Sequence, residues 1–177
     1  NHTPMFRRLQ PHKSYRHRED DFDDFADQPL LPNRLSRLGP GMALTDVDGD
    51  GMEELFIGGA SGQSGRLLSF DSSRQWWAEI STAAFPAHPS SEDLGALFFD
   101  ADSDGDMDLF VVSGGPGRYP FDARLRDRLY LNDGSGDFQE APAGTLPDLR
   151  DSGSTVVAAD FDRDGDLDLF VGGRYVP

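Results

Sequence analysis

The sequence predicts an all-β fold built from blades of four antiparallel strands, the unit that a β-propeller arranges around an axis. Three observations predict it. An acidic nonapeptide occurs three times, at residues 46–54, 100–108 and 160–168. Each copy is followed directly by Leu-Phe-Ile or Leu-Phe-Val, a short apolar run that is typical of a buried strand. Twenty glycines and twelve prolines interrupt the chain too often for a helical alternative.

The same order of elements is expected around each acidic loop. The strands that enter the loops are expected at 41–45, 94–99 and 154–159. The strands that leave them are expected at 55–58, 109–113 and 169–172. A third and a fourth strand follow at 66–70 and 75–80 in the first repeat, and at 128–131 and 137–140 in the second. The run Asn-Asp-Gly-Ser-Gly at 132–136 favours a hairpin between the last two.

The repeats occupy residues 38–177, and their blades are expected at about 38–82, 92–142 and 152–177. The third repeat holds only two of the four expected strands. Because a propeller typically closes with four to eight blades, the sequence predicts that the chain is a fragment of a larger propeller.

Residues 1–37 differ from the repeats in composition, with a basic start followed by an acidic stretch. We expect an irregular arm that packs on the blades rather than a separate binding element. The side chains expected to anchor it are Phe22, Phe25, Leu30 and Leu31.

Each acidic loop carries acids at positions 1, 3, 5 and 9 and a glycine at position 6. Calcium takes about six to eight oxygen ligands and tolerates irregular geometry, whereas magnesium demands a tight octahedron and retains its waters. Alternate side chains at positions 1, 3 and 5 can point at one ion. The glycine permits a sharp turn because it tolerates positive φ. A backbone carbonyl at position 7 and the carboxylate at position 9 can then complete the ligand set.

The sequence therefore predicts about three Ca²⁺ ions, one in each loop. The ligands predicted in the first loop are Asp46, Asp48, Asp50, Met52 and Glu54. Those in the second loop are Asp100, Asp102, Asp104, Asp106 and Asp108. Those in the third loop are Asp160, Asp162, Asp164, Asp166 and Asp168.

A solvated loop and an EF-hand are the two alternatives to these sites. A solvated acidic loop is the ordinary explanation of one such stretch, but three copies in the same frame argue against it. An EF-hand shares the Asp-x-Asp-x-Asp-Gly opening, yet it requires a Glu at position 12 and a following helix. Position 12 is Ile57, Val111 or Val171, each inside an expected strand, so the EF-hand alternative fails in all three copies.

The formal net charge is −16, and fifteen of the 32 acidic residues lie in the three loops. Three bound Ca²⁺ would change the net charge to −10, so much of the acidity is expected to serve as ligand. No basic face for nucleic acid is expected. No apolar stretch reaches the ~20 residues needed to span a bilayer. Calcium loops suit an exported protein, which predicts a secreted or cell-surface location.

Catalytic chemistry finds little support in the sequence. The four histidines lack ligand spacing, and there is no Gly-x-Ser-x-Gly motif, phosphate loop or Cys/His cluster. Paired carboxylates could serve glycoside hydrolysis, but acids that coordinate an ion are poor general acids. We therefore predict no catalytic residue and no enzymatic activity.

Residues 46–59, 100–115 and 160–173 resemble the FG-GAP/VCBS repeat family, which forms the blades of the integrin α-subunit head. They match its signature Asp-x-Asp-x-Asp-Gly-x-x-Asp-Leu-Phe-Val-Gly-Gly, with Glu54 as a conservative departure at position 9. Three wider runs resemble the cartilage acidic protein/ASPIC–UnbV type of exported bacterial protein. They are Leu30-Leu-Pro with Leu38-Gly-Pro-Gly, Asp127-Arg-Leu-Tyr-Leu-Asn-Asp-Gly, and Leu169-Phe-Val-Gly-Gly-Arg-Tyr-Val-Pro.

This resemblance implies a calcium-loaded extracellular propeller used for protein or glycan binding and adhesion, with calcium in a structural role. The implied partners are a cell-surface protein or glycan and the other blades or domains of a longer protein. It carries no catalytic residue onto this chain. Two alternatives stay open: the propeller part of a polysaccharide-degrading lyase or hydrolase, and a purely architectural spacer. Glycan binding without turnover would favour the binding module.

Overall fold

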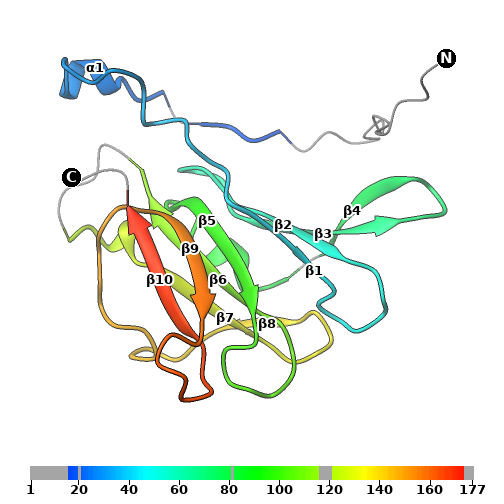
Figure 1. Ribbon diagram of the computed structural model, residues 1–177. Coiled ribbons are helices and arrows are strands. Elements are labelled where there is room, and N and C mark those ends of the chain that lie inside the picture. The colour runs from blue at the N-terminus through cyan, green and yellow to red at the C-terminus, as the bar shows by residue number, and fades with distance from the viewer. Residues whose placement is uncertain (1–15, 20, 81, 116–120, 174–177) are drawn as a thin grey trace, which may run out of the picture.

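The computed structural model describes residues 16–19, 21–80, 82–115 and 121–173. Its strands form three antiparallel sheets that follow one another in chain order, one from each repeat (Figure 1). This confirms the predicted all-β fold of propeller blades. In the described part of the chain, no helix is long and apolar enough to span a membrane.

The first two sheets each contain four strands, and the third contains two. The first sheet consists of β1 (Met42–Thr45), β2 (Glu54–Ile57), β3 (Arg66–Asp71) and β4 (Trp76–Ile80). The second consists of β5 (Glu92–Phe99), β6 (Asp108–Gly114), β7 (Arg128–Asn132) and β8 (Phe138–Glu140). The third consists of β9 (Gly153–Ala159) and β10 (Asp168–Gly173). The described residues also form three short helices, α1 (Asp24–Asp27), η1 (Phe85–Ala87) and η2 (Ala123–Leu125).

The strands begin and end within two residues of the predicted bounds. Gln75 is one of the differences: it was expected to open the fourth strand, but it lies in the turn before β4 with φ of 57°. Positive φ is uncommon for a residue with a side chain and is typical of a turn.

The register of each loop hairpin is the same in all three repeats. Thr45 pairs with Glu54 in the first. Phe99 pairs with Asp108 in the second, and Ala159 pairs with Asp168 in the third. The residue before position 1 therefore always pairs with position 9. This pairing brings positions 1 and 9 to the mouth of the loop, where the two strands meet.

Every residue of β6 is buried, because sheets cover both of its faces. Successive side chains of a strand point to opposite faces. Leu109 and Val111 join a cluster with residues of the first sheet, whereas Phe110 and Val112 join a cluster with Val156 of β9. A strand buried on both faces reads as a continuous apolar run. The burial of β6 therefore confirms that the Leu-Phe-Val run predicts a buried strand.

The first cluster lies between the first and second sheets and is centred on Phe85 of η1. The Phe85 ring lies 5.4 Å from that of Phe56, 5.1 Å from Tyr130 and 5.6 Å from Phe138, measured between ring centroids. Such edge-on and tilted contacts stabilise aromatic pairs beyond the area they bury. The connection between two blades thus supplies a core side chain.

Asp93 of β5 joins the first two blades through buried polar contacts. Its backbone N–H donates to the Gly59 carbonyl at 2.8 Å, and its carbonyl accepts from the Gly41 N–H at 2.8 Å. Its carboxylate accepts from the Gly59 N–H at 2.8 Å and is paired with the Arg128 guanidinium. Asp93 and Arg128 are both buried. The sequence predicts none of these contacts.

Residues 1–15 of the expected arm lie outside the described residues. In the part that is described, α1 lies apart from the sheets (Figure 1). Leu30 is 96% exposed and Phe25 is exposed as well, so the anchoring predicted for these two side chains is wrong. The contact with the first blade is polar: Gln63 bonds to the Arg16 carbonyl at 3.1 Å and to the Arg18 N–H at 2.9 Å.

Candidate metal centres in the three loops

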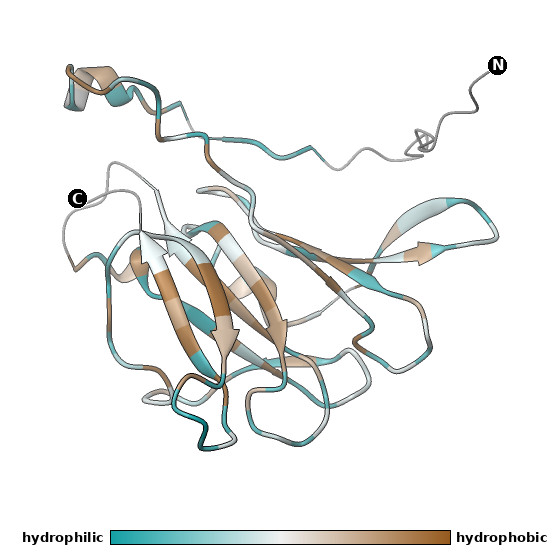
Figure 2. Cartoon of the chain, in the orientation of Figure 1, coloured by the Kyte–Doolittle hydropathy of each residue, from teal (hydrophilic) through white to brown (hydrophobic). Residues whose placement is uncertain are grey.

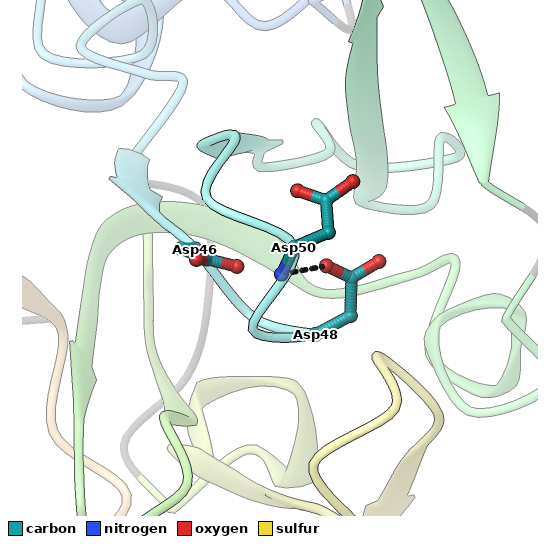
Figure 3. Close-up of side chains that lie close together, drawn as sticks. All are labelled: Asp46, Asp48 and Asp50. Atoms are coloured by element: carbon teal, nitrogen blue, oxygen red, sulfur yellow. Dashed lines mark hydrogen bonds between the residues drawn. The ribbon is translucent and has the colours of Figure 1, made fainter.

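The structure gathers three carboxylates in each acidic loop, with one oxygen of each within 4.8 Å of the others. In the first loop these are Asp46, Asp48 and Asp50 (Figure 3). In the second and third loops the groups are Asp100, Asp102 and Asp108, and Asp160, Asp162 and Asp168. The first group therefore uses positions 1, 3 and 5, whereas the other two use positions 1, 3 and 9.

Left-handed backbone at two positions lets each loop turn back on itself. The glycine at position 6 has φ of 84°, 98° and 101° at Gly51, Gly105 and Gly165. Position 4 also has positive φ in every loop: 72° at Gly49, and 64° at both Ser103 and Arg163. The sequence predicts the turn at position 6, because only glycine tolerates such φ freely. It does not predict the positive φ at position 4, where two of the three residues carry a side chain.

The carboxylates at positions 3 and 5 brace this turn in the same way in all three loops. Each accepts a hydrogen bond from the backbone N–H two residues later. The N–H groups of Asp50, Asp104 and Asp164 lie 3.2, 3.3 and 3.2 Å from the position-3 carboxylates. The N–H groups of Met52, Asp106 and Asp166 lie 2.7, 2.9 and 3.0 Å from the position-5 carboxylates. Short Asp side chains are suited to such local bonds.

The carboxylate at position 1 differs between loops. Asp46 uses both oxygens, accepting from Gly49 at 2.8 Å and from Gly51 at 2.9 Å. Asp100 accepts from Gly105 at 3.1 Å through Oδ2, while its Oδ1 is buried and has no hydrogen-bond partner among the described residues. A buried oxygen without a partner is costly, and a cation bound beside it would remove that cost.

The carboxylate at position 9 closes each loop by accepting from the N–H at position 2. Glu54 accepts from Val47 at 3.2 Å, Asp108 from Ala101 at 2.8 Å, and Asp168 from Phe161 at 2.9 Å. Glu54 and Asp108 are buried, whereas Asp168 is exposed. Burial raises the pKa of both Glu54 and Asp108, and the neighbouring Asp side chains raise it further.

These donor sets fit calcium. Two oxygens bound to one ion at about 2.4 Å can lie at most about 4.8 Å apart, and the gathered oxygens of each loop lie within that limit. All the gathered side-chain donors are oxygens. In the part of the chain that the structure describes, no ion pair joins a loop carboxylate to a basic side chain. The carbonyl ligands predicted at Met52, Asp106 and Asp166 stay predictions.

Asn132, the last residue of β7, connects the first two loops and was interpreted from the sequence only as part of a turn. Its Nδ2 donates to the Val47 carbonyl at 2.7 Å and to the Met107 carbonyl at 3.2 Å. Its backbone N–H donates to Asp108 Oδ1 at 2.8 Å, and its Oδ1 accepts from Gly136 at 3.1 Å. One buried side chain thus holds position 2 of the first loop beside position 8 of the second.

Replacing Asn132 with Ala is expected to lower the free energy of unfolding by about 1–3 kcal/mol, because the carbonyls of buried Val47 and of Met107 lose their donor. Urea unfolding followed by circular dichroism measures the change. Asn33→Ala is the matched control: Asn33 is exposed and, among the described residues, bonds only to the adjacent Arg34 carbonyl, so this substitution should change the free energy of unfolding little. Equal losses in the two variants would contradict the bridging role.

A cavity of about 400 Å³ lies beside β10, away from the loops. It is lined mainly by apolar side chains such as Phe110, Leu146 and Leu169, and its two acidic residues are Asp127 and Asp151. Burial raises the pKa of Asp127 to about 6, against a hydrogen bond from the Ser113 N–H. None of the loop carboxylates lines this cavity, so its lining and the candidate metal centres are separate.

Comparison with protein families finds one matching description, the FG-GAP-like repeat, over residues 46–111 and again over 100–171. Each match begins at position 1 of one loop and ends inside the leaving strand of the next. No curated protein and no solved structure matches the chain. The match does not extend to the ASPIC/UnbV type suggested by the wider runs.

Proposed function

Because the chain belongs to the FG-GAP-like repeat family, we propose that it is a calcium-stabilised extracellular β-propeller module that binds a protein or a glycan. The ions stabilise the loops and take no part in chemistry. In this proposal the partners are a cell-surface protein or glycan, together with further repeats or domains of a longer protein.

The observation that carries the proposal is the buried, unpartnered Oδ1 of Asp100, in a loop where Asp102 and Asp108 offer oxygens nearby. Three carboxylates this close repel one another when all are ionised. A divalent cation offsets this repulsion and supplies the partner that Asp100 lacks. The two other loops repeat the arrangement with small differences, so one ion per loop is the simplest occupancy.

A structural role for the ion follows from what the carboxylates already bind. Positions 1 and 9 lie at the junction of two strands, and positions 3 and 5 brace the turn between them. An ion held by these groups would fix the ends of β1 and β2, of β5 and β6, and of β9 and β10. Carboxylates committed in this way are poorly suited to proton transfer, which supports a binding module over a hydrolase.

The stoichiometry of calcium is expected to be about three ions per chain, because each loop holds its own carboxylate group. Metal analysis after dialysis against calcium, and calorimetric titration of chelator-treated protein, measure it. Asp162→Asn should remove one ion and leave the other two. A value near zero in the wild-type chain would overturn the calcium sites.

The binding role is tested separately on arrays of glycans and extracellular proteins, with the chain kept in calcium. Retention of a ligand without chemical change supports the module. A bound polysaccharide that is shortened during incubation would favour the lyase or hydrolase alternative. Absence of any ligand on both arrays would favour the architectural spacer.

A further inference from the structure

The hydrogen bonds of Asn132 form a continuous connection between the first and second acidic loops. Its Nδ2 donates to the Val47 carbonyl at 2.7 Å and to the Met107 carbonyl at 3.2 Å. Its backbone N–H donates to Asp108 Oδ1 at 2.8 Å. Asn132, Val47 and Asp108 are all buried, so a group that lost its partner here would find little water to replace it. We call these three hydrogen bonds the Asn132 bridge.

Both ends of the Asn132 bridge reach residues that shape the candidate metal centres. Val47 lies between Asp46 and Asp48, two of the three gathered carboxylates of the first loop. The Val47 N–H also donates to Glu54, at position 9 of that loop, at 3.2 Å. Asp108 belongs to the gathered group of the second loop. The bridge therefore joins the backbone beside two candidate ligands of one loop to a candidate ligand of the next.

The turn between β7 and β8 also packs closely against both loops. A Cβ atom on Gly136 would lie 3.4 Å from Val47 Cγ2 in the first loop. A Cβ atom on Gly134 would lie 2.5 Å from Asp106 Oδ2 in the second loop, closer than van der Waals contact allows. In Figure 2 the acidic loops are mostly hydrophilic, whereas the strands that they join carry apolar segments. The two loops thus contact one turn, and a shift of either loop disturbs that turn.

The arrangement of each loop depends on whether the charge of its carboxylates is offset. Three carboxylate oxygens within 4.8 Å of one another repel when all are ionised, and a bound cation holds them together. Asn132 can donate to both carbonyls only while Val47 and Met107 keep their places. An ion that fixes one loop therefore favours the arrangement that the other loop needs in order to bind its own ion.

We propose that calcium binding in the first and second loops is positively coupled through Asn132, so that an ion in either loop raises the affinity of the other. This inference rests on the calcium sites of the proposed function and adds that two of them are not independent. Coupling between two sites typically changes affinity by about 5–150-fold, and the factor is the same in both directions. The first two blades then take up calcium together.

Calorimetric titration of the chelator-treated chain with Ca²⁺ measures the coupling. Asp48→Asn, Asp102→Asn and Asp162→Asn disable one loop each by the same change at position 3, where the three carboxylates accept similar hydrogen bonds. Double variants, in which one loop alone binds, give the separate binding constants. With only the third loop disabled, the overall constant for two ions should exceed the product of the separate constants of the first two loops by about fivefold or more.

The first and third loops are the matched control pair, because β6 of the second sheet packs against the first sheet on one face and the third sheet on the other. Asp102→Asn retains this pair, and its overall constant should equal the product of the two separate constants. Adding Asn132→Ala to Asp162→Asn should reduce the factor for the first two loops to about one. Circular dichroism verifies folding. Asn132→Ser, whose side chain is too short to bridge both carbonyls, replaces Asn132→Ala if that variant does not fold.

Hydrogen exchange gives a second readout of the same coupling. In Asp48→Asn, calcium should slow exchange at 42–58 although the first loop no longer holds an ion, because the ion of the second loop fixes Asn132. In the double variant of Asp48→Asn with Asp102→Asn, where only the third loop binds, calcium should leave exchange at 42–58 unchanged.

The failure of this inference differs from the failure of the calcium sites. Single ions bound in each loop, with an overall constant equal to the product of the separate constants, would overturn the coupling and leave the calcium sites intact. A coupling factor that persists in the Asn132 variants would overturn the role of Asn132. Absence of calcium binding in the wild-type chain would overturn both the coupling and the proposed calcium sites.

Discussion

Removal of calcium by a chelator is expected to lower the free energy of unfolding by about 8 kcal/mol, starting from calcium at about one hundred times each dissociation constant. An ion that binds only the folded chain stabilises it by RT ln(1 + [L]/Kd), about 2.7 kcal/mol per site at that excess. The loops hold three candidate sites, so the three contributions add up to about 8 kcal/mol. Urea unfolding at fixed pH, with and without chelator, measures the difference.

Substitution of a single ligand distinguishes the stability that the ion contributes from the stability that the loop's own hydrogen bonds contribute. Asp102→Ala should lower stability strongly in calcium and far less in chelator, because its remaining contact is one hydrogen bond from the Asp104 N–H. Asp71→Ala is the matched control: Asp71 braces a turn outside the acidic loops through the N–H groups of Ser73 and Arg74. Asp71→Ala should lower the free energy of unfolding by the same amount in calcium and in chelator. Equal losses for Asp102→Ala in calcium and in chelator would assign Asp102 a hydrogen-bonding role only.

Hydrogen exchange locates the same effect along the chain. Calcium should slow exchange most at 42–58, 94–113 and 154–172, where each loop joins its two strands. The third and fourth strands of the first two blades should respond less, because none of them directly flanks an acidic loop. Uniform slowing over all strands would indicate general stabilisation of the fold instead of local stabilisation of each loop and its two strands.

Replacing Arg128 with Met is expected to lower the free energy of unfolding by about 3–5 kcal/mol, because it leaves the Asp93 carboxylate buried without its cation. Burial disfavours the charged guanidinium, but the charge of Asp93, the influence of Tyr130 and the hydrogen bonds to both together raise the pKa of Arg128. The same guanidinium also donates to Ser113 Oγ at 3.2 Å and lies 3.5 Å from the Tyr130 hydroxyl. Chemical denaturation gives the loss directly.

Two further variants define this effect. The double variant Asp93→Asn with Arg128→Met removes both charges and should be more stable than Arg128→Met alone. Arg66→Met is the matched control at the exposed pair of Arg66 with Glu79, whose atoms lie 2.9 Å apart, and it should cost about 0–1 kcal/mol. An Arg128→Met loss no larger than that of Arg66→Met would show that the buried pair adds nothing beyond a surface contact.

The loops and the strands beside them could be predicted closely from the sequence, since both depend on neighbouring residues. The turn at position 6 follows from the conformational freedom of Gly51, Gly105 and Gly165. The strands follow from continuous apolar runs, which survive only where sheets cover both faces. The carboxylates that face one another within nine residues also follow from spacing. Which three of the four gather in each loop does not: Glu54 and Asp108 are both buried at position 9, yet only Asp108 belongs to the gathered group.

Contacts between blades were decided only by the tertiary structure. Asn132 reaches Val47 across 85 positions of sequence, and Arg128 reaches Asp93 across 35. No local pattern marks either pair, because Asn132 and Val47 meet only when two sheets stack, and Arg128 and Asp93 meet only when β5 and β7 flank β6 in one sheet. The Phe residues of the Leu-Phe runs show in the same way that local sequence does not determine burial. Phe56 and Phe170 share their local sequence and register, yet one is buried and the other exposed, because burial is set by the neighbouring sheet and not by the strand itself.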